Sequence, residues 1–151
     1  MRVTRLIVGI TSVLAAVVLM LELGGPALAD PNSITVGGVW VCNITHDASG
    51  MTAAERIVQV RQRITNVLST DRFRSNPKVF VRVHAAGPDA IISVGDPQGQ
   101  VVVFTVTPQD AVGTSLTPVQ LARQWAPRLA QGLGQAMPSS YWNIPGHIYL
   151  F

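Results

Sequence analysis

The first 29 residues have the pattern of an export signal, so we expect the folded domain to consist of residues that follow them. Two arginines precede an apolar run that extends from Leu6 to Leu23, and a Gly-Gly-Pro segment then interrupts it. Small residues come next and end at Ala29, an order that is typical of an N-terminal export signal with its cleavage site. We therefore expect cleavage between Ala29 and Asp30 and an extracytoplasmic location, in a periplasm, in a thylakoid lumen or secreted outside the cell.

The alternative to cleavage is a retained membrane anchor, because the apolar run approaches the roughly 20 residues that a membrane-spanning helix needs. No later segment of the sequence is long and apolar enough to span a bilayer. The sequence is therefore expected to divide into a signal peptide over 1–29, one α/β domain over 30–137 and an aromatic C-terminal tail over 138–151.

The domain is predicted to begin with a hairpin and a helix. Two short apolar strands flank Gly37-Gly38, and adjacent glycines readily adopt the positive φ of a two-residue turn. Further on, Thr52 and Glu55 have the spacing of a capping box, in which each side chain binds the other residue's backbone N–H. Apolar residues at helical spacing follow this box and predict a helix that ends near Ser69.

The second half of the domain is predicted to contain three strands and two helices. Strict alternation predicts a strand over 78–84, and further strands over 89–95 and 100–106 complete an antiparallel meander. A Thr-Pro pair then begins each of two predicted helices, a short one over 107–113 and a long one over 117–136.

These elements predict an α+β fold, a two-layer sandwich with the element order ββ-α-βββ-α-α. The sheet is expected to be mainly antiparallel, with the helices over 52–69 and 117–136 on one face. Trp125 lies on the apolar stripe of the last helix and is expected in the core. The single cysteine, Cys42, is expected as a small buried residue, and it leaves no intrachain disulfide possible.

Basic residues are concentrated in one part of the sequence. The whole chain has a formal net charge of +3, but residues 55–82 hold seven lysines and arginines against two acidic residues, a local charge of +5. We expect either a basic face that approaches an anionic surface or, as the alternative, arginines that lie in solvent. Arg56, Arg61 and Arg63 border the apolar stripe of the first helix, where long side chains usually keep their charged ends in water. Nucleic acid is not an expected partner.

Four stretches carry a resemblance to a known family: Gly37-Gly38, 50–56 (GMTAAER), 104–111 (FTVTPQDA) and 116–126 (LTPVQLARQWA). In this order they resemble the extracytoplasmic domain that precedes the membrane helices in some bacterial small-conductance mechanosensitive-type channel proteins. The similarity covers about Ile34 to Met137. Because no channel helices follow the domain here, the resemblance implies a free-standing exported module that acts beside a membrane protein, and it does not imply channel activity.

His46 and His84 are the candidate residues for a metal or small-ligand site. If the strands that precede them were parallel neighbours, as in a β-α-β unit, both histidines would lie at one sheet edge, with Asp47 and Asp89 in the same loops. Two histidines and a carboxylate can hold a metal ion with an open position. A small-ligand or metal-binding domain at this edge is therefore the alternative function.

The principal hypothesis is an exported, non-enzymatic binding or accessory module that contacts a membrane protein or another envelope component. The sequence contains no nucleophile elbow and no glycine-rich phosphate loop, so no catalytic residue and no cofactor is expected. The contact surface is expected on the open sheet face and the aromatic tail, at Phe80, Arg82, Trp142, Tyr149 and Phe151.

Overall fold

Alternating and helical patterns in the sequence form two antiparallel sheets and three helices within the part of the chain that the structure describes. The computed structural model describes residues 30–74 and 79–137. From Pro31 onward these residues belong to one compact unit. The predicted signal peptide with its cleavage site after Ala29 and the aromatic tail with its three partner-surface residues lie outside the described residues.

The predicted hairpin is confirmed. Strand β1 (Ser33–Val36) pairs antiparallel with β2 (Val39–Asn43) around Gly37-Gly38, whose φ angles are 53° and 81°. A shift of register inserts Val41 as an extra residue in β2, so Val41 and Cys42 are both buried although they are neighbours. Burial of the Cys42 thiol raises its pKa, as expected for a cysteine inside the core.

The predicted meander is also confirmed. Strands β3 (Phe80–Ala86), β4 (Asp89–Asp96) and β5 (Gly99–Val106) form an antiparallel sheet in the order β3-β4-β5. A second shift of register lies in β5, where Val103 and Phe104 are both buried. The residues that alternate with these inward positions lie on the opposite face of the sheet.

Capping boxes determine where the two long helices begin. Helix α2 (Ala53–Ser69) starts after Thr52, whose backbone N–H donates to Glu55 Oε2 at 2.8 Å. Helix α4 (Pro118–Ala136) starts after Thr117, whose N–H donates to Gln120 Oε1, also at 2.8 Å. Both starts agree with the prediction. A further short helix, α3 (Asp71–Arg74), was not predicted.

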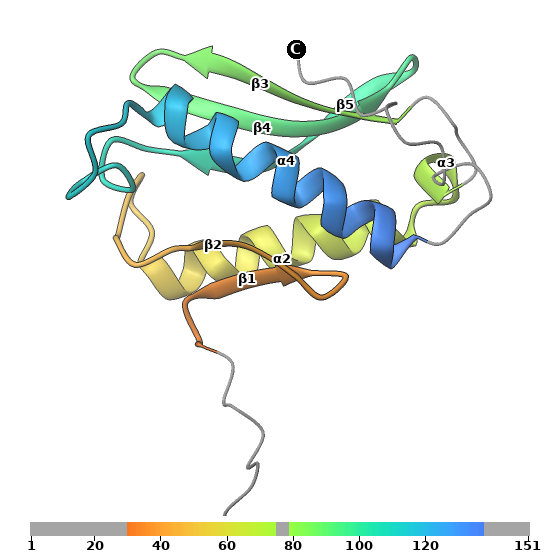
Figure 1. Ribbon diagram of the computed structural model, residues 1–151, viewed down its shortest axis with the longest axis horizontal. Coiled ribbons are helices and arrows are strands. Elements are labelled where there is room, and N and C mark those ends of the chain that lie inside the picture. Colours follow the sequence, from red (N-terminus) through yellow and green to blue (C-terminus); the bar gives the residue numbers. More distant parts are fainter. Residues whose placement is uncertain (1–29, 75–78, 138–151) are drawn as a thin grey trace, which may run out of the picture. The chain divides into compact units, whose positions relative to one another are not determined.

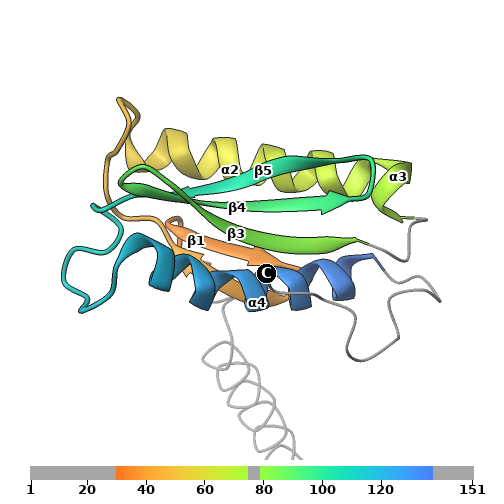
Figure 2. The ribbon, with the colours of Figure 1, turned by 90° about the horizontal axis from the view of Figure 1, so that it is seen from above.

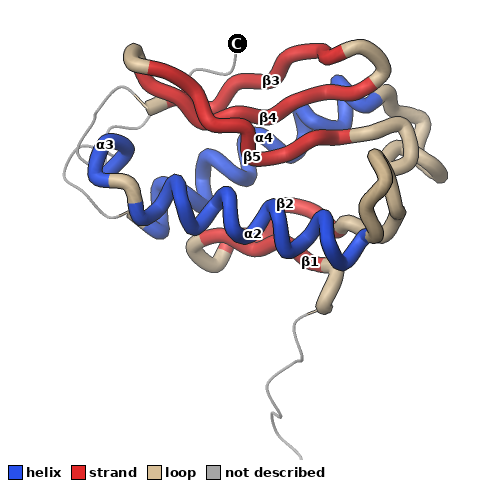
Figure 3. Tube along the Cα trace, turned by 180° about the vertical axis from the view of Figure 1, so that it is seen from behind, coloured by secondary structure: helices blue, strands red, loops and turns tan. Residues whose placement is uncertain are grey.

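Both long helices pack on strands. Figures 1 and 3 show the three-stranded sheet on one side and α2, α4 and the hairpin on the other. Seen from above in Figure 2, α2 lies along β5 and α4 lies on the opposite side. Helix α4 contacts both sheets, whereas α2 contacts β5 and β1. One apolar core includes residues of both sheets and both helices, so the hairpin and the meander depend on the same packing.

Trp125 lies in this core, as predicted. Only 6% of its surface is exposed, and its ring meets the edge of Phe104 with 5.9 Å between centroids. This T-shaped contact joins α4 to β5 in an arrangement that aromatic rings favour.

Helix α4 approaches the hairpin turn so closely that two glycines are required. A Cβ atom at Gly132 would lie 2.5 Å from the carbonyl oxygen of Val36, and one at Gly37 would lie 2.3 Å from the carbonyl oxygen of Gly132. Neither distance is possible for a real side chain, so these glycines allow the backbones of α4 and the turn to meet.

The predicted fold class, α+β with antiparallel strands and helices packed on them, is confirmed, but two details were wrong. The hairpin forms a separate sheet and does not extend the meander. Residues 107–113 form successive turns in place of a helix, with the N–H groups of Asp110 and Ala111 bound three residues back. A segment this short does not form enough helical hydrogen bonds to offset the cost of nucleation.

Candidate functional site

The outer face of the three-stranded sheet is the candidate binding surface. Strand pairing places nine side-chain positions on this face in three rows that cross the sheet from β3 to β5. The rows are Phe80–Gly95–Gln100, Arg82–Ser93–Val102 and His84–Ile91–Thr105. Among the described residues, the helices contact the opposite face, and no strand or helix covers these rows.

Phe80 and Arg82, both predicted for a partner surface, lie together on this face. The guanidinium carbon of Arg82 is 5.2 Å from the centroid of the Phe80 ring, which is a cation–π distance. The ring itself lies across Gly95, since a Cβ atom there would be 2.9 Å from Phe80 Cε2 and 2.7 Å from Gln100 Cγ. These two side chains therefore close over the glycine.

The middle and last rows combine apolar and polar groups. Ser93 is almost fully buried, and its hydroxyl donates to Gln100 Oε1 at 2.9 Å. Val102 is 38% exposed, and Ile91 is partly exposed. The nine positions include one arginine and one histidine and no carboxylate.

The predicted His46/His84 edge is not formed. The strand before His46 belongs to the hairpin sheet and the strand of His84 belongs to the meander, so they are not parallel neighbours. Asp47 instead accepts a hydrogen bond from the N–H of Ala53 at 2.7 Å and thereby helps to cap α2. Nowhere in the described ranges do three or more His, Cys, Asp or Glu side chains, these two histidines and Asp89 included, gather as metal ligands would.

Arg56 has a role that the sequence analysis missed. Its head was expected in water, but the residue is only 5% exposed. Its Nη1 donates to Asp110 Oδ1 at 2.9 Å and to the carbonyl of His46 at 2.6 Å, while Nη2 donates to Asp110 Oδ2 at 2.6 Å and to the carbonyl of Thr105 at 3.3 Å. Asp110 also accepts from the N–H of Thr107 at 2.8 Å. The pair therefore joins α2, the loop before it and the end of β5.

Two further arginines of the basic segment also bind within the fold. Arg72 pairs with the buried carboxylate of Asp96 and donates to the carbonyl of Gly99 at 2.8 Å, and hydrogen bonding to Asp96 raises the pKa of Arg72. Arg61 donates to the carbonyl of Ser33 at 3.0 Å. Two arginines of the segment are thus paired with carboxylates and a third binds a strand carbonyl, whereas a basic face that approaches an anionic surface stays a prediction.

The described part of the chain contains two long helices and one short one. Its two long helices do not combine the length and apolar character needed to cross a bilayer, and α3 is a single turn. Polar side chains on the outer sheet face are spread over three strands and include no acidic partner for His84 in its own row.

Comparison with known proteins identifies one family. A family model described as "Domain of unknown function (DUF8459)" matches residues 33–136, from β1 to the last residue of α4. Neither the curated proteins nor the solved structures contain a match to the chain.

Proposed function

The chain belongs to the DUF8459 family, and we propose that it is an exported, non-enzymatic binding module that docks a membrane protein of the cell envelope on the outer face of β3, β4 and β5. The family match spans both sheets and both long helices. The docking face is therefore part of the domain that the family shares.

The observation that carries the proposal is the contrast between the two faces of this sheet. The inner face is covered by the core, whereas the outer face presents Phe80, Ile91 and Val102 with no covering element among the described residues. Apolar side chains with polar neighbours on a sheet face without a covering element are typical of protein-contact surfaces. We propose this face as the contact, together with the aromatic tail of the sequence.

The side chains of the face define the chemistry of the partner. Arg82 and His84 lie in adjacent rows, and the three rows contain no carboxylate. A complementary partner surface has apolar side chains opposite Val102 and hydrogen-bonding side chains opposite the exposed His84. The leader sequence supports export of the chain, and the resemblance to domains that precede channel helices supports a membrane protein as the partner.

Site-specific photocrosslinking in cells tests this proposal. A photoreactive phenylalanine analogue is placed at His84 or Val102 on the sheet face, and at the exposed positions Gln62 on α2 and Gln124 on α4 as controls. We expect one membrane-protein adduct from the two sheet positions and none from the helix positions. Equal adducts from all four positions, or adducts from the helices alone, would contradict the proposal.

Charge reversal provides the second part of the test. Arg82→Glu is expected to lower the adduct yield from Val102 by about tenfold or more, since a new carboxylate that is desolvated at a contact without a partner costs several kcal/mol. Arg123→Glu makes the same change of charge at an exposed position on α4 and is expected to leave the yield unchanged. An equal loss of adduct yield in both variants would show that only net charge matters, and would contradict a specific contact at Arg82.

Export itself is tested by fractionation. The processed chain is expected in the envelope or the medium, and its N-terminus is expected at Asp30. An intact precursor in the cytosolic fraction would contradict export, and turnover of a metabolite by the purified chain would contradict a non-enzymatic role.

A further inference from the structure

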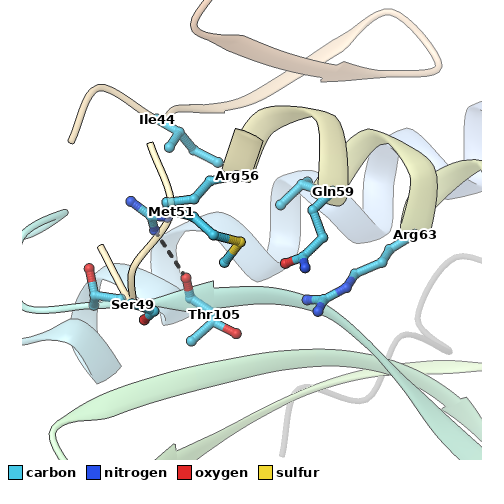
Figure 4. A pocket seen from close by; sticks show the side chains of 9 residues that line it. Ile44, Ser49, Met51, Arg56, Gln59, Arg63 and Thr105 are labelled. Atoms are coloured by element: carbon cyan, nitrogen blue, oxygen red, sulfur yellow. Dashed lines mark hydrogen bonds between the residues drawn. The ribbon is translucent and has the colours of Figure 1, made fainter. Parts of the chain in front are cut away.

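A cavity of about 150 Å³ lies between the first half of α2, the loop before it and the end of β5 (Figure 4). Six of the residues that line it are Ser49, Met51, Gln59, Val60, Arg63 and Thr105. None of the residues lining it is an aspartate or glutamate. The cavity therefore combines an apolar wall with uncharged polar groups and arginine.

Two arginines lie at this cavity, and they differ in how they are bound. Arg56 is saturated by Asp110 and by two backbone carbonyls, so its charge is neutralised within the fold. Arg63 is two turns further along α2 and is partly exposed. In Figure 4 its guanidinium group extends toward β5, below Gln59. No side chain or carbonyl of the described residues accepts a hydrogen bond from it, which leaves its charge available to a ligand.

The loop that forms one wall of the cavity is held in a fixed shape. Ala48 and Met51 exchange backbone hydrogen bonds of 3.0 Å, and both turn residues between them have positive φ, 55° at Ser49 and 75° at Gly50. Positive φ at a residue other than glycine is uncommon and persists where surrounding contacts enforce it. Here the carbonyl of His46 binds Arg56, so the wall is fixed to α2 before any ligand arrives.

From these observations we infer that the cavity binds a small oxyanion, a carboxylate or phosphate group, through the guanidinium group of Arg63. The planar fork of arginine suits two-point binding of such groups. Gln59 can add an amide N–H donor, and Ser49 can add a hydroxyl donor.

The size of the cavity limits the ligand. About 150 Å³ corresponds to roughly five water molecules at about 30 Å³ each. This is below the roughly 300 Å³ at which pockets for drug-sized molecules begin. The cavity therefore accommodates a free small anion or the charged end of a longer molecule. The remainder of a longer molecule would extend past Met51 and Gln59, because these two residues also line a shallow depression on the outside of α2. The inference is independent of docking on the sheet face.

Titration of the purified full chain by NMR tests the site, with sodium propionate, inorganic phosphate and neutral propionamide as probes. Propionamide matches propionate in size and lacks the charge. We expect saturable shifts of the Arg63 Nε–H signal and of the Ser49 amide with propionate, with phosphate or with both, and none with propionamide. Saturation by only one of the two anions would identify which oxyanion the cavity accepts.

Three variants separate the site from general electrostatics. Arg63→Gln is expected to weaken binding at least about tenfold, as for loss of a charged hydrogen bond, while Arg63→Lys retains part of the affinity. Arg123→Gln makes the same change of charge on α4 and is expected to bind like the parent chain. Gln59→Leu removes the amide donor of Gln59 without a change of charge and is expected to weaken binding. This variant tests the site independently of whether Arg63→Gln folds. Equal binding of propionamide, unchanged affinity in Arg63→Gln and Gln59→Leu, or absence of shifts with both anions would overturn the inference.

Discussion

Arg56 and Asp110 are 54 positions apart in the sequence and form a two-pronged ion pair, with nitrogen–oxygen distances of 2.9 and 2.6 Å. Their side chains are only 6% and 2% exposed. The pair connects the beginning of α2 to the turn after β5, and Asp110 also binds the backbone of Thr107. One buried contact therefore fixes three segments that no local sequence pattern relates.

Removing one partner of this ion pair is expected to be strongly destabilising. Arg56→Met leaves the Asp110 carboxylate buried without its cation, which typically costs about 3–5 kcal/mol. Urea denaturation measures the loss. Arg63→Met, two turns further along the same helix, is the matched control and is expected to stay within about 0.5 kcal/mol of the parent chain. Similar losses in the two variants would contradict a special role for the buried pair.

Trp125→Ala is expected to cost about 3–5 kcal/mol, because it removes a large buried ring together with its edge contact to Phe104. The comparison is Trp40→Ala, since Trp40 is 48% exposed and stacks on Arg128 at the surface. We expect a loss of about 1 kcal/mol or less there. Thermal unfolding of both variants measures the difference, and a loss below about 1 kcal/mol for Trp125→Ala would place that ring outside the core.

Gly132→Ala is expected to destabilise the fold, although alanine normally stabilises a helix by about 1 kcal/mol relative to glycine. The reason is the 2.5 Å distance that the new Cβ would have to the Val36 carbonyl oxygen. Gln131→Ala, at the neighbouring exposed position, keeps the helical preference without the clash and is expected to be neutral or stabilising. Stabilisation by both substitutions would show that α4 does not approach the hairpin turn so closely.

The two capping boxes are expected to respond differently to acid. The carboxylate of Glu55 accepts hydrogen bonds from the N–H and hydroxyl of Thr52, and these bonds lower its pKa. A lowered pKa means that the stabilisation is complete above the ordinary value of about 4.3 and is lost as the pH falls through the folded value. Glu55→Gln should therefore be less stable than the parent chain at neutral pH and approach it in acid.

The box at α4 is the built-in control for this pH dependence. Gln120 binds the N–H of Thr117 at 2.8 Å, the same distance as in the first box, but its amide does not titrate. Gln120→Ala is thus expected to lower stability by an amount that does not change between neutral and acidic pH. Unfolding midpoints of the parent chain and both variants, measured at neutral and acidic pH, give the two comparisons. If the stability difference between Glu55→Gln and the parent chain did not change with pH, the role of the Glu55 charge would be contradicted.

Local patterns in the sequence were sufficient for most elements of the fold. Gly37-Gly38 indicated the hairpin because its conformational requirement is contained in two residues, and Thr52 with Glu55 indicated the start of α2 for the same reason. The burial of Trp125 followed from helical spacing alone. Each of these features depends on residues that are close together in the chain.

Features that depend on distant residues could not be predicted in this way. Nothing near Arg56 indicates that its partner is Asp110, and nothing in β2 indicates that the strand after α2 joins a different sheet. The assumption of a parallel crossover therefore placed His46 and His84 at one edge, and the separate sheets overturn it. The candidate surface was anticipated at Phe80 and Arg82 because alternation alone determines which face of β3 they occupy.

The arginine contacts along β5 have a consequence for self-association. Arg56 binds the carbonyl of Thr105 near one end of this strand, and Arg72 binds the carbonyl of Gly99 at the other. A second polypeptide that approached this side would have to displace guanidinium groups held by buried carboxylates before it could add a strand. Addition of a strand from an identical molecule is thus opposed on this flank of the meander.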